Sequence, residues 1–157
     1  MKTTIITNNQ RACAYPDLFG SSVFRGSPLF IYAENLFYNG LSQMAVEYKG
    51  GYFDFLKLSK NDQIEIESNG FIPVISSNEC TSFTSPFGTT QKLTMKAASL
   101  VTWVIVLEQI ANNNSIVRDN LYRVIQDIKY SYTELIDEEG TKVFSKDDCR
   151  SIYKLLD

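Results

Sequence analysis

The stretch Tyr48–Ser59, YKGGYFDFLKLS, decides the fold predicted for this chain. Two adjacent glycines precede a strand-forming run that contains two Phe residues and a single Asp. Successive side chains alternate in a strand, so Phe53 and Phe55 share one face of the predicted strand 52–58, and Asp54 lies on the other with two leucines. Neither face is purely polar. This pattern predicts the central strand of a sheet that is covered on both sides.

The two glycines are predicted to lie before this strand and to end the preceding helix. Apolar residues recur at helical spacing from Leu29 to Ala45, and Pro28 suits a position near the helix start. Gly50 or Gly51 can take the left-handed conformation that closes a helix. The other glycine lets the chain turn into the strand without a side chain in the way.

The residues after the strand predict a three-stranded antiparallel meander. Gln63–Glu67, QIEIE, alternates between polar and apolar residues. The Asn69-Gly70 pair is a strong hairpin signal, and Phe71–Ile75 is the predicted return strand. Pro73 has no backbone N–H, so this last strand is expected at an edge of the sheet.

The second half of the chain is predicted to be mostly helical. Residues 92–112 carry their polar side chains on one narrow stripe, which predicts a mostly buried helix containing Trp103. The β-branched run VTWVIV leaves a strand as the alternative there. A long amphipathic helix is predicted over 117–136. Ser145–Asp148 resembles a capping box that begins a short last helix.

The remaining segments complete the predicted domain organisation. Residues 1–14 are polar and irregular and are expected to form a flexible N-terminus. The polar segment 76–91 predicts a long loop, with an irregular strand around 81–84 as the alternative. Residues 15–157 are therefore expected to form a single α+β domain, in which a small antiparallel β-meander packs against several α-helices.

Composition argues against several classes of function. The chain has 15 basic and 18 acidic side chains, and this balance lacks the basic excess of an electrostatic nucleic-acid binder. It also cannot imitate duplex DNA, which carries a charge about every 1.7 Å. The absence of histidine excludes His-based catalytic triads and His-based metal sites within the chain. The three widely spaced cysteines form no C-x-x-C pair and indicate a reduced, cytoplasmic chain. No apolar run is long enough to span a bilayer.

The acidic residues offer candidate sites, each with a simpler structural interpretation. A carboxylate among aromatic residues, such as Asp54, is costly to bury and is typical of functional sites. It can equally be a structural group that accepts hydrogen bonds from the backbone or from an Arg such as Arg25. Asp137-Glu138-Glu139 and Asp147-Asp148 are acidic clusters near helix ends, where a structural role is the simpler interpretation. No catalytic set emerges, so we expect no enzyme activity, cofactor or metal site.

Three motifs, taken in order, resemble the ArdB/KlcA antirestriction family. PDLFG (16–20), ENLFYNGL (34–41) and YKGGYFDFLKLSKN (48–61) follow the family's P-x-x-F-G, its E-N with a Tyr a few residues on, and its Y-x-G-G-Y-W-x-F-Y-x-L-x-N block. The end of the chain, FSKDDCRSIYKLLD, resembles the family's closing helix, which often ends in Ile-Asp where this chain has Leu156-Asp157. The resemblance extends over residues 16–157.

Several positions depart from the family pattern. Phe53 stands where the family usually has Trp, Asp54 where Glu is common, and Leu56 where Tyr is common. The family's N-G-G-F after the strand is replaced by NDQI. The chain therefore resembles a distant member.

The resemblance implies a protein carried by plasmids and other mobile elements that relieves type I restriction of incoming DNA. It implies protein–protein interaction without DNA mimicry, and the partner is either the type I restriction–modification enzyme or a protein that controls it. The candidate binding residues are Glu34, Asn35, Asp54 and Asp157. The alternatives are a counter-defence factor against another system, such as a CRISPR effector, and a carboxylate-based enzyme.

Overall fold

The computed structural model describes residues 2–5, 18–20, 23–24, 26–51, 53–59, 71–75 and 77–156. The largest sheet is antiparallel in the order β1-β4-β5, formed by Lys2–Ile5, Phe53–Ser59 and Phe71–Ile75. Two further antiparallel pairs join β2 (Val23–Phe24) to β3 (Ser27–Pro28) and β6 (Cys80–Thr84) to β7 (Thr90–Thr94).

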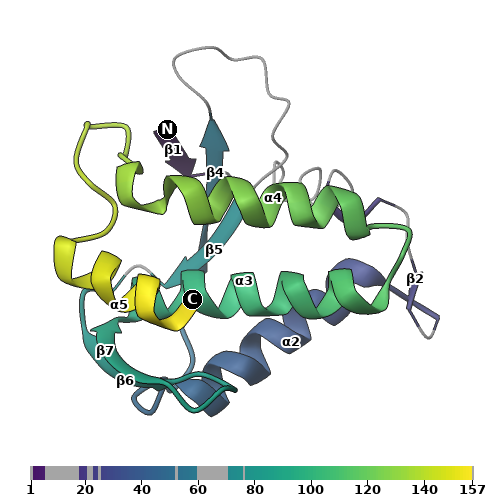
Figure 1. The fold of residues 1–157 in the computed structure, drawn as a ribbon, viewed down its shortest axis with the longest axis horizontal. Coiled ribbons are helices and arrows are strands. Elements are labelled where there is room, and N and C mark those ends of the chain that lie inside the picture. Colours follow the sequence, from purple (N-terminus) through teal and green to yellow (C-terminus); the bar gives the residue numbers. More distant parts are fainter. Residues whose placement is uncertain are drawn as a thin grey trace.

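The helices are α2 (Leu29–Met44), α3 (Met95–Asn113), α4 (Arg118–Ser131) and α5 (Lys146–Leu156), with a 3₁₀ turn η1 at Tyr132–Glu134. Helix α3 runs through the middle of the molecule, between α4 and α2 (Figure 1), and also packs against β5 and α5. The predicted α+β fold class is confirmed. No helix in the described part of the chain combines the length and hydropathy needed to cross a bilayer.

The central place of α3 explains its sequence. Thirteen of its 19 residues are buried, including Trp103 at 1% exposure. Its two buried hydroxyls are satisfied within the helix, because Ser99 Oγ donates to the Met95 carbonyl and Thr102 Oγ1 to the Ala98 carbonyl, both at 2.8 Å. The helix predicted for residues 92–112 is confirmed from Met95 on, whereas residues 92–94 belong to β7, and the alternative strand over VTWVIV is wrong.

The aromatic face of β4 packs toward α2 and α3, as its central position in the sheet requires. The Phe37 ring lies 4.9 Å from the ring of Phe53 and 5.8 Å from that of Trp103, both in edge-to-face geometry. Pro73 lies in β5 at the edge of the sheet, as predicted.

The predicted meander is wrong in its middle strand. Strands β4 and β5 pair directly, with Phe53 opposite Ile75 and Lys57 opposite Phe71, so residues 63–67 do not lie between them. Residues 60–70 lie outside the described part of the chain. The third strand is β1, which pairs with the other edge of β4.

The N-terminal residues were expected to be irregular, and four of them are not. Residues Lys2–Ile5 form β1 because the β-branched run Thr-Thr-Ile suits a strand once a partner strand is present. The remaining residues of the predicted flexible segment 1–14 lie outside the described residues.

Helix α2 ends before the glycine pair, which corrects the predicted boundary. It stops at Met44, and Ala45 is already extended and bridges to Phe83 of β6. Pairing with β6 therefore ends the helix. Gly50 has φ +92°, so it contributes to the turn toward β4 and not to the helix end.

Most of the predicted loop 76–91 belongs to a hairpin, which begins with β6 at Cys80 and extends to the end of β7 at Thr94. The alternative strand around 81–84 is confirmed as β6, and the sequence analysis missed β7. Thr81 and Phe83 point inward and are buried, and the inward residue of β7 opposite Thr81 is Leu93. The sequence does not show this alternation, because threonine occurs on both faces of the strand: Thr81 is buried and Thr84 is exposed.

Candidate functional site

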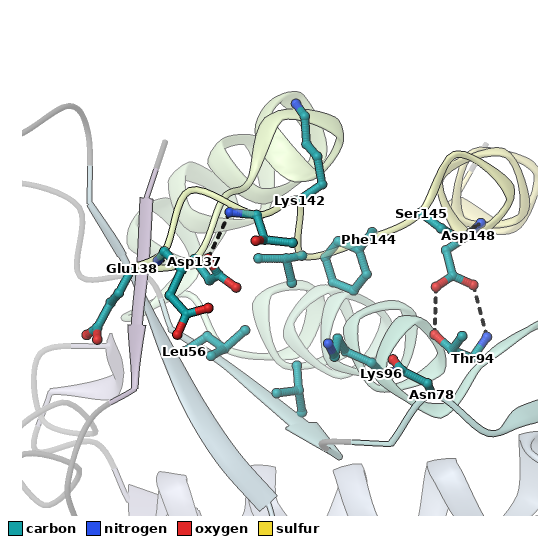
Figure 2. Close-up of a pocket in the computed structure, with 14 residues that line it drawn as sticks. Leu56, Asn78, Thr94, Lys96, Asp137, Glu138, Lys142, Phe144, Ser145 and Asp148 are labelled. Carbon is teal, nitrogen blue, oxygen red and sulfur yellow. Dashed lines mark hydrogen bonds between the residues drawn. The ribbon is translucent and has the colours of Figure 1, made fainter.

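A groove of about 740 Å³ lies between the sheet and the segment that joins η1 to α5. Leu56 and Val74, from β4 and β5, form its apolar floor, and Phe144, from the joining segment, adds an aromatic side chain to the lining. One wall is the turn Asp137–Glu139, and the other is formed by the first residues of α3 and α5 (Figure 2). A groove with an apolar floor and a few polar groups is typical of binding sites.

The acidic wall is a turn held by its first residue. The Oδ1 atom of Asp137 accepts hydrogen bonds from the backbone N–H groups of Glu139 and Thr141, each at 2.9 Å. Gly140, with φ +80°, donates its N–H to the Asp137 carbonyl at 3.0 Å. The turn therefore fixes the backbone of Glu138 and Glu139, whose side chains are exposed.

The opposite wall is fixed by a buried carboxylate. Asp148 is 6% exposed, and its two oxygens accept from the Thr94 N–H at 3.0 Å and the Thr94 hydroxyl at 2.6 Å. Thr94 in turn caps α3 by accepting from the Ala97 N–H at 3.3 Å. One carboxylate thus joins the start of α5 to the start of α3.

The predicted capping box is confirmed in one half only. Ser145 Oγ accepts from the Asp148 N–H at 3.1 Å, as the motif predicts. The Asp148 side chain turns to Thr94 instead, since the buried N–H of another element needs an acceptor.

Lys96 supplies the positive charge inside the groove. Its side chain is half-buried and points along the floor, beside Phe144 (Figure 2). Within the described ranges it forms no ion pair and no hydrogen bond. The second lysine of the lining, Lys142, donates to the Thr133 carbonyl at 3.2 Å and points away from the floor.

The structure separates the residues predicted from sequence. Glu34 lines a small cavity on the α2 side of the sheet, with Phe37 and Phe53. Asp54 lies opposite Val74 on the other face of β4, because side chains alternate along a strand. Asn35 is exposed on α2, and Asp157 lies outside the described residues.

The groove residues were missed because they come from separate segments. Glu138 and Glu139 belong to an acidic cluster that the sequence analysis interpreted as structural. Nothing in the local sequence singles out Lys96, which looks like any exposed position near a helix start. Among the described residues, no three Cys, Asp or Glu side chains are grouped closely enough to hold a metal ion.

Glu47 and Cys149, which lie outside the groove, have shifted pKa values, each with a local cause. Hydrogen bonds from the Thr81 hydroxyl and the Ser82 N–H hold the pKa of Glu47 below its ordinary range. Burial, followed by the nearby Asp148 charge, raises the pKa of the Cys149 thiol, which makes it a poor nucleophile. The hydrogen bonds that Glu47 accepts from Thr81 and Ser82 join the segment that follows α2 to β6.

The comparisons with known proteins identify the fold. This chain is similar to the structure of the KlcA and ArdB proteins, which is described as showing a novel fold and antirestriction activity against type I DNA restriction systems in vivo but not in vitro. The TM-score is 0.70 at 18% sequence identity, over 99% of this chain and 94% of that chain. No protein-family profile matches the chain, and no curated protein matches it in sequence. The fold expected from the motif order is thus confirmed.

Proposed function

We propose that this protein relieves type I restriction of incoming DNA and that it acts by binding another protein. The observation that supports this most is the match of fold over nearly the whole chain to KlcA and ArdB. Fold alone does not fix function. The ordered motifs at 16–20, 34–41 and 48–61, which resemble the same family, supply a second and independent support.

Protein binding agrees with the charges of the chain. A net charge of −3 provides neither the basic surface that phosphates require nor the dense negative charge of a DNA mimic. The KlcA and ArdB activity is described as present in vivo but not in vitro. A protein that acts through a further cellular component would behave in this way. We therefore favour a protein that controls the restriction enzyme as the partner, over the enzyme itself.

Phage plating tests this function. Unmodified phage are titred on cells with a type I restriction system, with and without this chain, and on a non-restricting strain. We expect the chain to raise plating by orders of magnitude in the restricting cells alone. Unchanged plating, with the protein soluble and folded, would contradict the proposal and direct the search to other defence systems, such as CRISPR effectors.

Asp54 keeps a place among the candidate binding residues. It lies on the sheet face that carries Leu56 and Val74, two residues of the groove floor. We expect Asp54→Asn to reduce the relief of restriction without changing the melting temperature. Normal plating with a lowered melting temperature would instead assign Asp54 a structural role. Glu34, on the opposite face, is the matched comparison.

A further inference from the structure

We propose that the groove binds an extended segment of the protein partner, in which an apolar side chain lies between an acidic and a basic residue. The inference rests on the proposed function and adds the chemistry of the bound segment. Three features carry it: the apolar floor, the unpaired lysine and the acidic turn.

The floor fits an apolar side chain of the partner. Leu56 and Val74 present aliphatic side chains, and Phe144 adds an aromatic ring that is 3% exposed. The groove, at about 740 Å³, falls within the range of about 300–1,000 Å³ that is usual for binding sites. It therefore accommodates a large side chain together with part of the backbone that carries it.

Lys96 fits a carboxylate of the partner. Its side chain is half-buried, and no described residue supplies its ammonium with a counter-ion or a hydrogen-bond acceptor. An incoming carboxylate would accept a charge-assisted hydrogen bond from this ammonium, and such bonds are stronger than those between neutral groups. Asp148 forms no ion pair with Lys96, and its two oxygens accept hydrogen bonds from Thr94.

The acidic turn fits a basic side chain of the partner. Glu138 and Glu139 are exposed, and the hydrogen bonds to Asp137 hold their backbone in place. Glu138 lies at the opposite end of the groove from Thr94 and Asp148, with Leu56 between them and closer to the turn (Figure 2). The order along the groove is therefore a positive group, an apolar floor and a negative pair. The bound segment should carry the complementary order.

The same charges disfavour nucleic acid as the occupant. A strand of phosphates would meet one ammonium, that of Lys96, and the two carboxylates of Glu138 and Glu139. Phosphate binding instead requires several basic groups. The charge pattern thus favours a polypeptide, whose side chains can supply both signs within a few residues.

Charge-reversed variants in restricting cells provide the first test. Two groove variants, Lys96→Glu and the double variant Glu138→Lys/Glu139→Lys, are compared with two controls outside the groove, Lys92→Glu and Glu134→Lys. We expect the groove variants to lose more than about tenfold in plating relief, since each places like charges together. The controls should plate as the unaltered chain does, and all variants should keep its melting temperature. Full relief by the folded groove variants would overturn the inference.

A random peptide library displayed on phage tests binding without any assumption about restriction. The library is selected on the purified full chain, and the enriched peptides are then measured on the Lys96→Glu variant. We expect peptides with an acidic, an apolar and a basic residue in that order or its reverse. We also expect them to lose at least about tenfold in affinity on the variant, because its new carboxylate would lie against the acidic residue of the peptide. Peptides that bind the variant equally well would overturn the inference, including any that bind instead at a second groove, which is lined by Tyr130, Tyr132 and Tyr153.

The two tests separate the two proposals. If the unaltered chain fails to relieve restriction but binds the expected peptides through Lys96, the proposed function fails and the groove inference stands. If it relieves restriction and the groove variants do so equally, the groove inference fails and the proposed function stands.

Discussion

The indole N–H of Trp103 donates a 2.9 Å hydrogen bond to the carbonyl oxygen of Phe71, the first residue of the edge strand β5. Farther along the same edge, the Ser99 hydroxyl oxygen accepts from the Ile75 N–H at 3.1 Å. Pro73 lies between these two positions and has no N–H to satisfy. Side chains of α3 thus complete the outer hydrogen bonds of β5, which protects this edge from pairing with another strand.

Side chains of α5 form hydrogen bonds with the backbone of β7 in a similar manner. Ser151 Oγ donates to the Lys92 carbonyl at 3.0 Å, and Asp148 accepts from the Thr94 N–H. Neither β5 nor β7 therefore presents a row of free backbone groups for a partner strand. This arrangement favours recognition through side chains in the groove over the addition of a strand at these two edges.

Replacing Trp103 with Phe should destabilise the protein by about 1–3 kcal/mol, because the buried Phe71 carbonyl loses its donor. The free energy of unfolding is measured by urea titration, followed by far-UV circular dichroism because Trp103 is the sole tryptophan. The control is Tyr130→Phe at an 82% exposed position, which should change stability by less than about 0.5 kcal/mol. Equal stability of the two variants would show that the hydrogen bond contributes little.

The contact between Asp148 and Thr94 should appear as a coupling energy. Asp148→Asn and Thr94→Val are measured alone and together in a double-mutant cycle. Thr94→Val removes the hydroxyl that donates to Asp148, and Asp148→Asn removes the charge that strengthens this hydrogen bond, so we expect a coupling of about 1–3 kcal/mol. Strict additivity would mean that the hydrogen bond from the Thr94 hydroxyl gains nothing from the charge of Asp148.

Sequence reasoning succeeded where one element carries its own pattern. Helices α2 and α3 were found because their apolar residues repeat along the element, and the edge position of β5 follows from Pro73 alone. It failed where the structure of a segment depends on another segment that is distant in the sequence. The strand β1 forms because β4 offers a free edge, and α2 ends where Ala45 meets Phe83. The groove was missed for the same reason, since Leu56, Lys96 and Glu138 meet only in the folded chain.

Two glycines should respond to alanine in opposite directions. Gly50 has φ +92° with open space around it, so Gly50→Ala should cost about 1 kcal/mol through backbone strain alone. Gly40 lies inside α2, where alanine is the better helix former by about 1 kcal/mol. An added Cβ there would meet the flexible Met44 Cε at 3.3 Å, which can move aside. We therefore expect Gly40→Ala to raise the melting temperature and Gly50→Ala to lower it. The same sign for both would contradict the assigned conformations.

The stabilising contribution of Glu47 should depend on pH. The Thr81 hydroxyl, and then the Ser82 N–H, hold the pKa of the folded-state carboxylate below its ordinary value of 4.5. A lowered folded-state pKa stabilises the protein at pH values above the unfolded pKa, and this contribution is lost as pH falls through the folded value. Glu47→Gln should therefore melt below the unaltered chain at about pH 7, and the difference should shrink toward about pH 3.

Thr81→Val provides the matched control for Glu47, because it removes the same hydrogen bond and keeps the carboxylate. Its difference from the unaltered chain should also shrink as pH falls, since protonation of Glu47 weakens the bond in the unaltered chain as well. Melting temperatures are compared by circular dichroism across this range of pH. A difference for Glu47→Gln that stays constant with pH would show that the carboxylate is not stabilised by its contacts with β6.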